Sequence, residues 1–187
     1  MKKLLACAAA FILVAGPLLA ASVDGVKVPD TVTVGAKTLT LNGAGVRRKM
    51  IVRVYIAALY LENMSKDGAA IIASDETKSM HLKMLRAVEG SKISGAIVEG
   101  FENNSGALMA ALRPRLEKLS KMIPDVKEGD EIALTWIPDQ GTVVSVRGKD
   151  NGTIEGRDFA DALFSVWLGA NPVQDDLKAA LLAGGGS

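Results

Sequence analysis

Hydrophobic and polar residues alternate in several stretches of the chain, as is typical of strands with one buried face. The stretches that fit strands are residues 26–28, 32–34, 37–41, 51–61, 78–86, 131–138 and 142–148. Turn-forming residues separate or follow them at Pro29-Asp30, Gly35-Ala36, Asp139-Gln140-Gly141 and Asp150-Asn151-Gly152. Residues 51–61, which are rich in β-branched and aromatic side chains, give the strongest strand prediction. The glycines of Asn42-Gly43-Ala44-Gly45 allow a bend or bulge.

Elsewhere the hydrophobic residues recur at helical spacing. The predicted helices are residues 66–74, 93–101, 108–123 and 159–167, and a last one capped by Asn171-Pro172 that runs to Leu182. Asn103-Asn104-Ser105-Gly106 resembles a turn, and Pro114 is expected to kink or split its helix because proline has no N–H to donate. Together the elements predict one α+β domain, in which a large, mainly antiparallel sheet carries helices on one face.

The N-terminus has the layout of a secretory signal peptide. Lys2 and Lys3 precede an apolar run from Leu4 to Val14, and small residues follow at 20–22. We predict a leader over residues 1–21, a mature domain over residues 22–183 and a flexible tail over residues 184–187. We expect a periplasmic or secreted protein without a stable membrane anchor, because no later stretch approaches the roughly 20 apolar residues of a spanning helix.

Composition narrows the classes of function. The single cysteine, Cys7, lies in the leader, so the mature domain has neither disulfide nor thiol chemistry and depends on its hydrophobic core. Loss of Lys2 and Lys3 leaves 20 basic residues of the original 22, against 21 acidic ones. This balance, and the lack of aromatic residues interleaved with Arg47-Arg48-Lys49, argue against a nucleic-acid partner.

Few residues could support catalysis or bind a metal. His81 is the only histidine and no G-x-S-x-G motif occurs, so a serine–histidine triad is not indicated. With no mature cysteine and no tight group of carboxylates, we predict neither a metal site nor a cofactor. Gly43-Ala44-Gly45 lacks the third glycine and the following helix of a dinucleotide-binding motif.

A polar pair lies within the strongest strand. Arg53 and Tyr55 are two residues apart, so their side chains share a face with apolar neighbours, and such a pair suits the carboxylate or phenolate end of a hydrophobic molecule. Arg47 has the same parity, but on a straight strand it would lie about 26 Å from Tyr55. A turn near residues 48–50 would bring the two together. The alternative is that residues 47–49 form a solvated turn and Tyr55 is a core aromatic residue.

Three segments carry a resemblance to a known family. LNGAGVRRKMIVRVYIAALYLE resembles the segment of chalcone isomerase and its relatives in which a glycine-rich bend and an arginine lead into a long strand. GSKISGAIVEGFENN is similar to the helix that follows Gly-Ser-Lys in the plant enzymes, and FADALFSVWLGANPVQDDLKAALL to the C-terminal helix pair of exported bacterial members. The order and spacing of the segments cover nearly all of the mature chain.

The resemblance implies a fold in which a cleft between sheet and helices holds an apolar ligand. In the fatty-acid-binding relatives an arginine and a tyrosine hold the carboxylate, and these positions correspond to Arg47 and Tyr55. In the isomerase the same arginine directs a phenolate toward ring closure, through charge placed where the transition state needs it. Arg47 is therefore the first candidate for the site.

The sequence also departs from the enzyme. The enzyme's threonine in the long strand falls at Tyr55, which matches the fatty-acid-binding pattern instead. The tyrosine expected within Gly95 to Val98 is missing, and Val166 stands where the enzyme has a threonine in its cleft. The enzyme's amide side chain corresponds to Asn103 or Asn104. These changes argue against flavonoid cyclisation.

We therefore expect the domain to bind a small apolar anion, with a fatty acid as the leading candidate, and not to turn it over. Arg47 would supply the charge, Tyr55 a neutral hydrogen bond, and Arg53 a weaker second cation. The residues expected to form the cleft walls, or else the core, are Phe101, Val166 and Trp167. One alternative is an isomerase or lyase that acts on a phenolic substrate through Arg47. Another is an envelope interaction module with an empty cleft.

Overall fold

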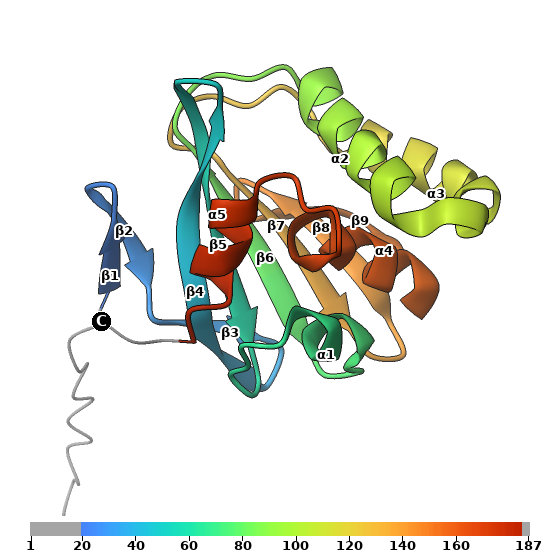
Figure 1. Cartoon of the computed structure of the whole chain (residues 1–187), viewed down its shortest axis with the longest axis horizontal. Helices are drawn as coiled ribbons and strands as arrows, with labels where there is room; N and C mark the ends of the chain where they lie inside the picture. Colours follow the sequence, from blue (N-terminus) through green and yellow to red (C-terminus); the bar gives the residue numbers. More distant parts are fainter. Residues whose placement is uncertain (1–19, 185–187) are drawn as a thin grey trace, which may run out of the picture.

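The computed structural model describes residues 20–184, and its centre is a seven-stranded antiparallel sheet (Figure 1). Its strands follow one another in space in the order β3-β4-β5-β6-β7-β8-β9. Their bounds are Thr31–Val34 (β3), Lys37–Lys49 (β4), Val52–Leu61 (β5), Lys78–Met84 (β6), Glu131–Ile137 (β7), Gly141–Val146 (β8) and Lys149–Ile154 (β9). Each strand therefore pairs with the next one along the chain, and every neighbouring pair is antiparallel.

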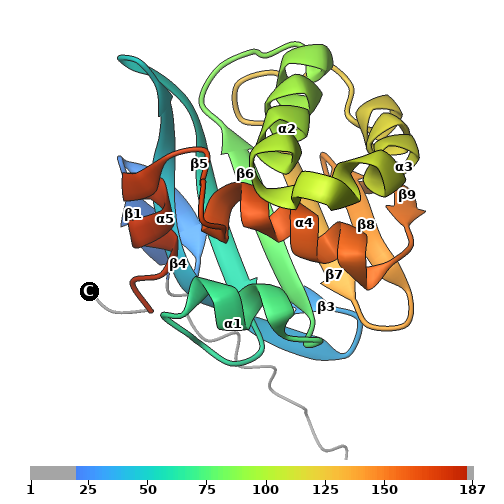
Figure 2. The same ribbon diagram turned by 45° about the vertical axis from the view of Figure 1, so that its right-hand side comes forward.

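Helices cover one face of this sheet (Figures 1 and 2). They are α1 (Gly68–Ala73), α2 (Gly90–Ser105), a 3₁₀ turn η1 (Gly106–Leu108), α3 (Met109–Met122), α4 (Arg157–Leu168) and α5 (Asp175–Leu181). The main core lies between them and the sheet, where Phe101 of α2, Leu116 of α3 and Leu163 of α4 join buried residues such as Leu82 and Leu134. The predicted α+β class, with helices on one face, is confirmed.

A short hairpin covers part of the opposite face of the sheet. Its strands are β1 (Ala20–Val23) and β2 (Val26–Pro29), which pair only with each other (Figure 1). Val28 of β2 packs against Leu39 of β4 and Ile56 of β5 in a second, smaller cluster. Strand β5 is therefore buried on both faces over most of its length, which explains its continuous apolar sequence.

The predicted leader and tail lie mostly outside the described residues. Ala20 and Ala21 are described, and they begin β1 by pairing with Pro29 and Val28. The first strand thus begins two residues before the predicted mature domain. Of the tail, Gly184 is described and residues 185–187 are not. No helix within residues 20–184 is both long enough and apolar enough to cross a membrane.

Two turn predictions were wrong. Residues 103–106 do not form a turn after α2, because the helix runs on to Ser105 and a 3₁₀ turn continues it. The Asn104 side chain is the reason: its Nδ2 donates to the Gly100 carbonyl inside the helix and to the Asn171 carbonyl, 2.9 and 2.8 Å away. The reversal predicted at Asp150-Asn151-Gly152 lies instead at Arg147 and Gly148, both with positive φ.

The residues mistaken for that turn belong to strand β9, which pairs with β8 through a register shift after Val144. Gly152 has a φ of 149° there, which explains why a turn-like sequence can occur within a strand. Two helix predictions also need correction. Helix α3 is not split, because it continues through Pro114 with Leu112 and Leu116 buried on either side of the proline. Helix α5 begins at Asp175 rather than at Asn171-Pro172.

Candidate functional site

The site is built on the hairpin formed by β4 and β5. The chain reverses at Met50 and Ile51, so that Arg47 lies directly opposite Tyr55 in the strand register. Side chains of directly opposed residues on one face have Cβ atoms about 5 Å apart. The turn that the two candidates needed therefore exists, one residue later than expected. A register shift between Arg47 and Arg48 separates this pair from the rest of the hairpin tip.

Tyr55 is held from the helix side by Trp167. The indole Nε1 of Trp167, on α4, donates to the Tyr55 hydroxyl oxygen at 3.1 Å. Burial raises the pKa of the Tyr55 phenol, and hydrogen bonding from Trp167 and the nearby charge of Arg47 oppose this only in part. The phenol is thus neutral at physiological pH. Because its oxygen accepts from Trp167, its own proton remains available to an acceptor.

Arg47 is partly buried and held by neutral groups. Its Nη1 donates to the Gln174 side-chain oxygen at 3.1 Å and also to the backbone carbonyl of Arg48. Within residues 20–184 it forms no ion pair with a carboxylate, in contrast to its neighbours Arg48 and Arg53. A partly desolvated guanidinium without a counter-charge is a favourable place for an anion.

Gln174 connects the hairpin to helix α5. Its Oε1 also accepts the backbone N–H of Arg48 at 2.8 Å, and its Nε2 donates to the Val46 carbonyl at 3.2 Å. Sequence reasoning missed this residue, because it assigned residues 171–174 to the start of a helix. A glutamine just before two aspartates is a weak signal by itself, and only the three-dimensional contact reveals its role.

Two glycines of β4 allow α5 to approach the hairpin (Figure 2). A Cβ atom at Gly43 would lie 2.3 Å from the Ala180 carbonyl oxygen, and one at Gly45 would lie 2.8 Å from the Ala180 Cβ. Buried Asn42 fixes the approach, since its Nδ2 donates to the Leu181 carbonyl at 2.8 Å. The bend or bulge predicted over residues 42–45 occurs as a register shift between Leu41 and Gly43.

Arg53 is directed to a different partner. Its Nη1 donates to Asp24 Oδ2 at 2.8 Å, and Asp24 lies in the turn between β1 and β2. The Nη2 atom of Arg48 lies 3.7 Å from the same carboxylate oxygen. Hydrogen bonding from Arg53 lowers the pKa of Asp24, so the pair is charged at neutral pH. Of the two arginines first considered, the structure pairs Arg47, and not Arg53, with Tyr55.

The predicted wall residues Phe101, Val166 and Trp167 are all buried in the main core. Phe101 stacks at a tilt against Phe159, with ring centroids 5.3 Å apart. Val166 packs where α4 crosses Gly100 of α2. Of the three, Trp167 alone makes a described hydrogen bond to the Arg47–Tyr55 pair, through Tyr55.

Two cavities lie elsewhere in the described domain. One, of about 200 Å³, lies beside α1 and the end of β5 and is lined by residues such as Leu61, Ile71 and Lys78. The other is an open groove of about 870 Å³ between α1, the ends of α2 and α4, and α5, with Ile72, Leu168 and Leu182 in its lining. Neither is lined by Arg47 or Tyr55. Leu182, just beyond the last residue of α5, lines the groove, whereas Gln174, just before the first residue of α5, contacts Arg47.

The register of the hairpin places two hydrogen-bond donors, the Arg47 guanidinium and the Tyr55 hydroxyl, on directly opposed residues. His81 contacts other residues: its Nδ1 lies 3.1 Å from Glu131 Oε1, and its ring packs edge-on against Tyr60. Among residues 20–184 no group of three His, Cys, Asp or Glu side chains is placed to hold a metal.

The model of one family, described as chalcone isomerase-like, matches residues 20–183. The chain belongs to the chalcone isomerase-like family. A similar solved structure is the fatty-acid binding protein AtFAP1 of Arabidopsis thaliana, with a TM-score of 0.69 and 14% sequence identity over 84% of this chain and 92% of that one. A search of curated proteins finds no match.

The three segments that carried the resemblance occupy connected parts of this chalcone isomerase-like fold. The first forms the β4–β5 hairpin, the second α2, and the third α4 and α5. Arg47, Tyr55, Trp167 and Gln174 all lie within the residues that the family model matches. At 14% identity, the likeness to AtFAP1 shows a common fold.

Proposed function

We propose that the protein binds a small apolar carboxylate, such as a fatty acid, at the Arg47–Tyr55 pair and does not turn it over. The proposal rests on one observation: both the Arg47 guanidinium and the Tyr55 hydroxyl can still donate to a ligand. Arg47 has neutral protein partners and no ion pair among the described residues, and Tyr55 is a neutral phenol whose oxygen is already occupied by Trp167. One carboxylate can accept from both, with one oxygen for each donor.

The surroundings suit an apolar molecule. Tyr55 is partly buried against the main core, as are Val54 beside it in the strand and Val173 beside Gln174. The solved neighbour AtFAP1 is a fatty-acid binding protein, which supports the same ligand class for this chain. We propose a periplasmic location because of the predicted leader.

An isomerase that acts on a phenolic substrate is the second candidate, favoured by the family's description and by the partly buried charge of Arg47, which forms no ion pair among the described residues. In that case the guanidinium would stabilise a phenolate during ring closure. Against it, the side chain at position 166 is the buried Val166, which can donate no hydrogen bond. Helix α2, in which the enzyme's tyrosine is expected, contains none.

Extraction of bound lipid tests the binding proposal. Purified wild type is extracted with organic solvent and analysed by mass spectrometry, in parallel with Arg47→Met and Arg53→Met. The second variant is a matched control. It removes an arginine from the same hairpin, but that arginine, Arg53, is already paired with Asp24. We expect fatty acid from wild type and Arg53→Met, and little from Arg47→Met. Equal recovery from all three would refute the proposal.

An enzyme assay distinguishes binding from catalysis. The rate of chalcone loss is measured with and without protein, against the slow spontaneous reaction. We expect no acceleration from wild type. Acceleration that disappears in Arg47→Met would replace the binding proposal with the isomerase.

A further inference from the structure

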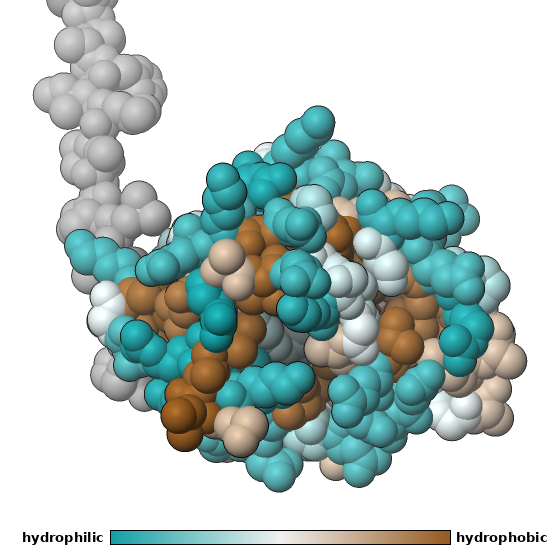
Figure 3. Space-filling model, turned by 90° about the horizontal axis from the view of Figure 1, so that it is seen from above, coloured by the Kyte–Doolittle hydropathy of each residue, from teal (hydrophilic) through white to brown (hydrophobic). Residues whose placement is uncertain are grey.

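The tip of the β4–β5 hairpin exposes apolar side chains. Met50 and Ile51 are 92% and 94% exposed, and Val52 is 39% exposed. Figure 3 looks down on the end of the molecule that bears this tip and shows hydrophobic residues at the surface among hydrophilic ones. Two almost fully exposed apolar residues in sequence at a hairpin turn differ from single apolar residues scattered over a surface, which need no explanation.

The backbone at the tip is also unusual for these residue types. Lys49 pairs with Val52, so Met50 and Ile51 form a two-residue connection. Met50 has a φ of 56°, a conformation for which two-residue hairpin turns normally use glycine, asparagine or aspartate. Methionine at this position costs conformational energy, and its exposed side chain recovers none of it through packing within the chain.

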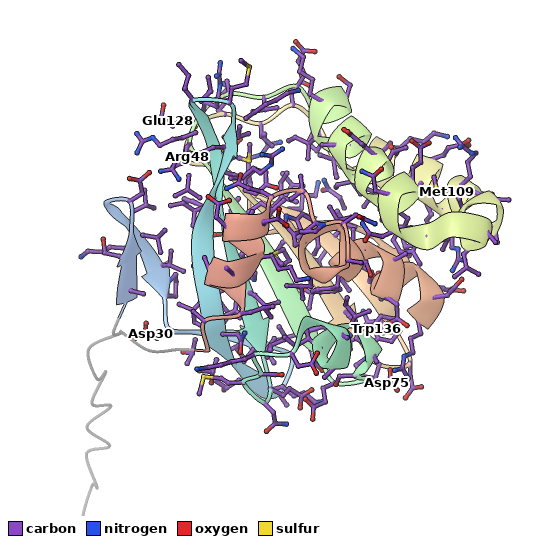
Figure 4. All side chains as sticks on the ribbon, in the orientation of Figure 1. Asp30, Arg48, Asp75, Met109, Glu128 and Trp136 are labelled. Atoms are coloured by element: carbon purple, nitrogen blue, oxygen red, sulfur yellow. The ribbon has the colours of Figure 1, made fainter. Side chains whose placement is uncertain are left out.

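Basic residues flank the apolar tip. Arg47, Arg48, Lys49 and Arg53 all lie within three residues of the turn. Asp24 pairs with Arg53 and Arg48, and its hydrogen bond to Arg53, together with its charge and the more distant charge of Glu128, raises the pKa of Arg53. Figure 4 shows Glu128 and Arg48 at the same end of the molecule. Residues 47–53 themselves contain four basic side chains and no acidic one, so the hairpin tip is positively charged.

We propose that the tip of the hairpin inserts into the surface of a bilayer that contains anionic phospholipid. Met50 and Ile51 would enter the boundary between headgroups and acyl chains, while Arg48 and Lys49 would contact the phosphates. Charge selects this partner, since an apolar point surrounded by cations matches an anionic surface with an apolar interior. The contact is reversible, because a single turn buries far less apolar surface than a spanning segment. It requires no ligand at Arg47 and so goes beyond the proposed binding function.

Vesicle sedimentation tests this proposal. Wild type is mixed with phosphatidylcholine vesicles with or without phosphatidylglycerol, and the bound fraction is measured at low and at high salt. We expect binding that requires phosphatidylglycerol and weakens with salt. Met50→Ser/Ile51→Ser should bind about tenfold more weakly, because the insertion of apolar side chains is lost. Arg48→Ala/Lys49→Ala should bind roughly twenty-five-fold more weakly, at about fivefold for each basic residue.

The control is Leu108→Ser/Lys121→Ala, which removes one exposed apolar and one exposed basic residue from η1 and α3. Figure 4 places neighbouring Met109 on the side of the molecule away from Arg48. This variant should bind like wild type. If wild type ignores anionic vesicles, or if tip and control variants bind equally, the proposal is wrong.

Sedimentation velocity excludes the competing explanation. A wild-type dimer that the tip substitutions dissociate would make the tip a contact between two copies, and would also overturn the proposal. Lipid extraction distinguishes failure here from failure of the binding function. Met50→Ser/Ile51→Ser leaves Arg47 and Tyr55 intact and should still yield fatty acid.

Discussion

Replacement of Gly43 by alanine should detach α5 from the sheet. The added Cβ would lie 2.3 Å from the Ala180 carbonyl oxygen and 2.6 Å from that of Leu181. Both are backbone atoms, so no rotation of a side chain can relieve the contact. Either α5 moves away from β4, or the strand bends away from α5.

The cost follows from what α5 buries. Leu177 and Leu181 are almost fully buried, and a leucine that loses its burial costs about 1.5–3 kcal/mol. Partial exposure of the two, together with a weakened hydrogen bond from Asn42 to the Leu181 carbonyl, predicts a loss of about 3 kcal/mol. For a domain of this size that corresponds to a fall in Tm of roughly 6–12 °C.

Urea denaturation followed by fluorescence of Trp136 and Trp167 measures the change. Gly95→Ala is the matched control, because Gly95 is exposed on α2 and a Cβ there would contact nothing within 4 Å. That variant should be more stable than wild type by about 0.5–1 kcal/mol, since alanine favours a helix. If Gly43→Ala is as stable as Gly95→Ala, the tight seat of α5 on β4 is refuted.

Three further predictions concern single side chains. Tyr55→Phe loses a donor and the partner of Trp167, so titration calorimetry should show fatty-acid affinity about fivefold to tenfold weaker. Burial lowers the pKa of Lys78 to about 8 from an ordinary 10.5, so the charged form is disfavoured in the folded state. Urea titrations should therefore show wild type gaining stability relative to Lys78→Met between these two pH values, and a constant difference would contradict this. Arg115 lowers the pKa of Asp158 through two hydrogen bonds, of 2.7 and 2.6 Å. Asp158→Asn should cost less than about 1 kcal/mol at neutral pH, and thermal melts should show the difference vanishing as pH falls well below 3.8, the ordinary pKa of the carboxyl.

Most of the fold can be predicted from the pattern of this sequence, because the local signals agree with the tertiary structure. The β7–β8 hairpin and the end of α4 at Gly169 lie where alternation, helical spacing and turn residues indicate. The failures occur where a distant contact overrides a local preference. Asn104 extends α2 by binding Asn171, and the turn-like sequence around Gly152 is extended because it pairs with β8.

The site could be predicted only in part, for a related reason. Arg47 and Tyr55 could be named because they lie in one distinctive segment, and the turn that joins them is local. Trp167 was identified as a wall, but its hydrogen bond to Tyr55 spans 112 residues and leaves no trace in the local pattern. Gln174 was missed because its three contacts to the hairpin all come from a residue that ends an irregular loop.

In the proposed binding mode, the guanidinium of Arg47 holds the charged head of an apolar ligand. The most direct test is a cycle of binding measurements by titration calorimetry, with delipidated wild type and Arg47→Met, each against a fatty acid and the alcohol of the same chain length. If Arg47 binds the carboxylate, wild type should prefer the acid by about tenfold or more, as expected of a charge-assisted hydrogen bond, and Arg47→Met should lose that preference while it retains its affinity for the alcohol. An equal preference for the acid in both proteins would contradict the account.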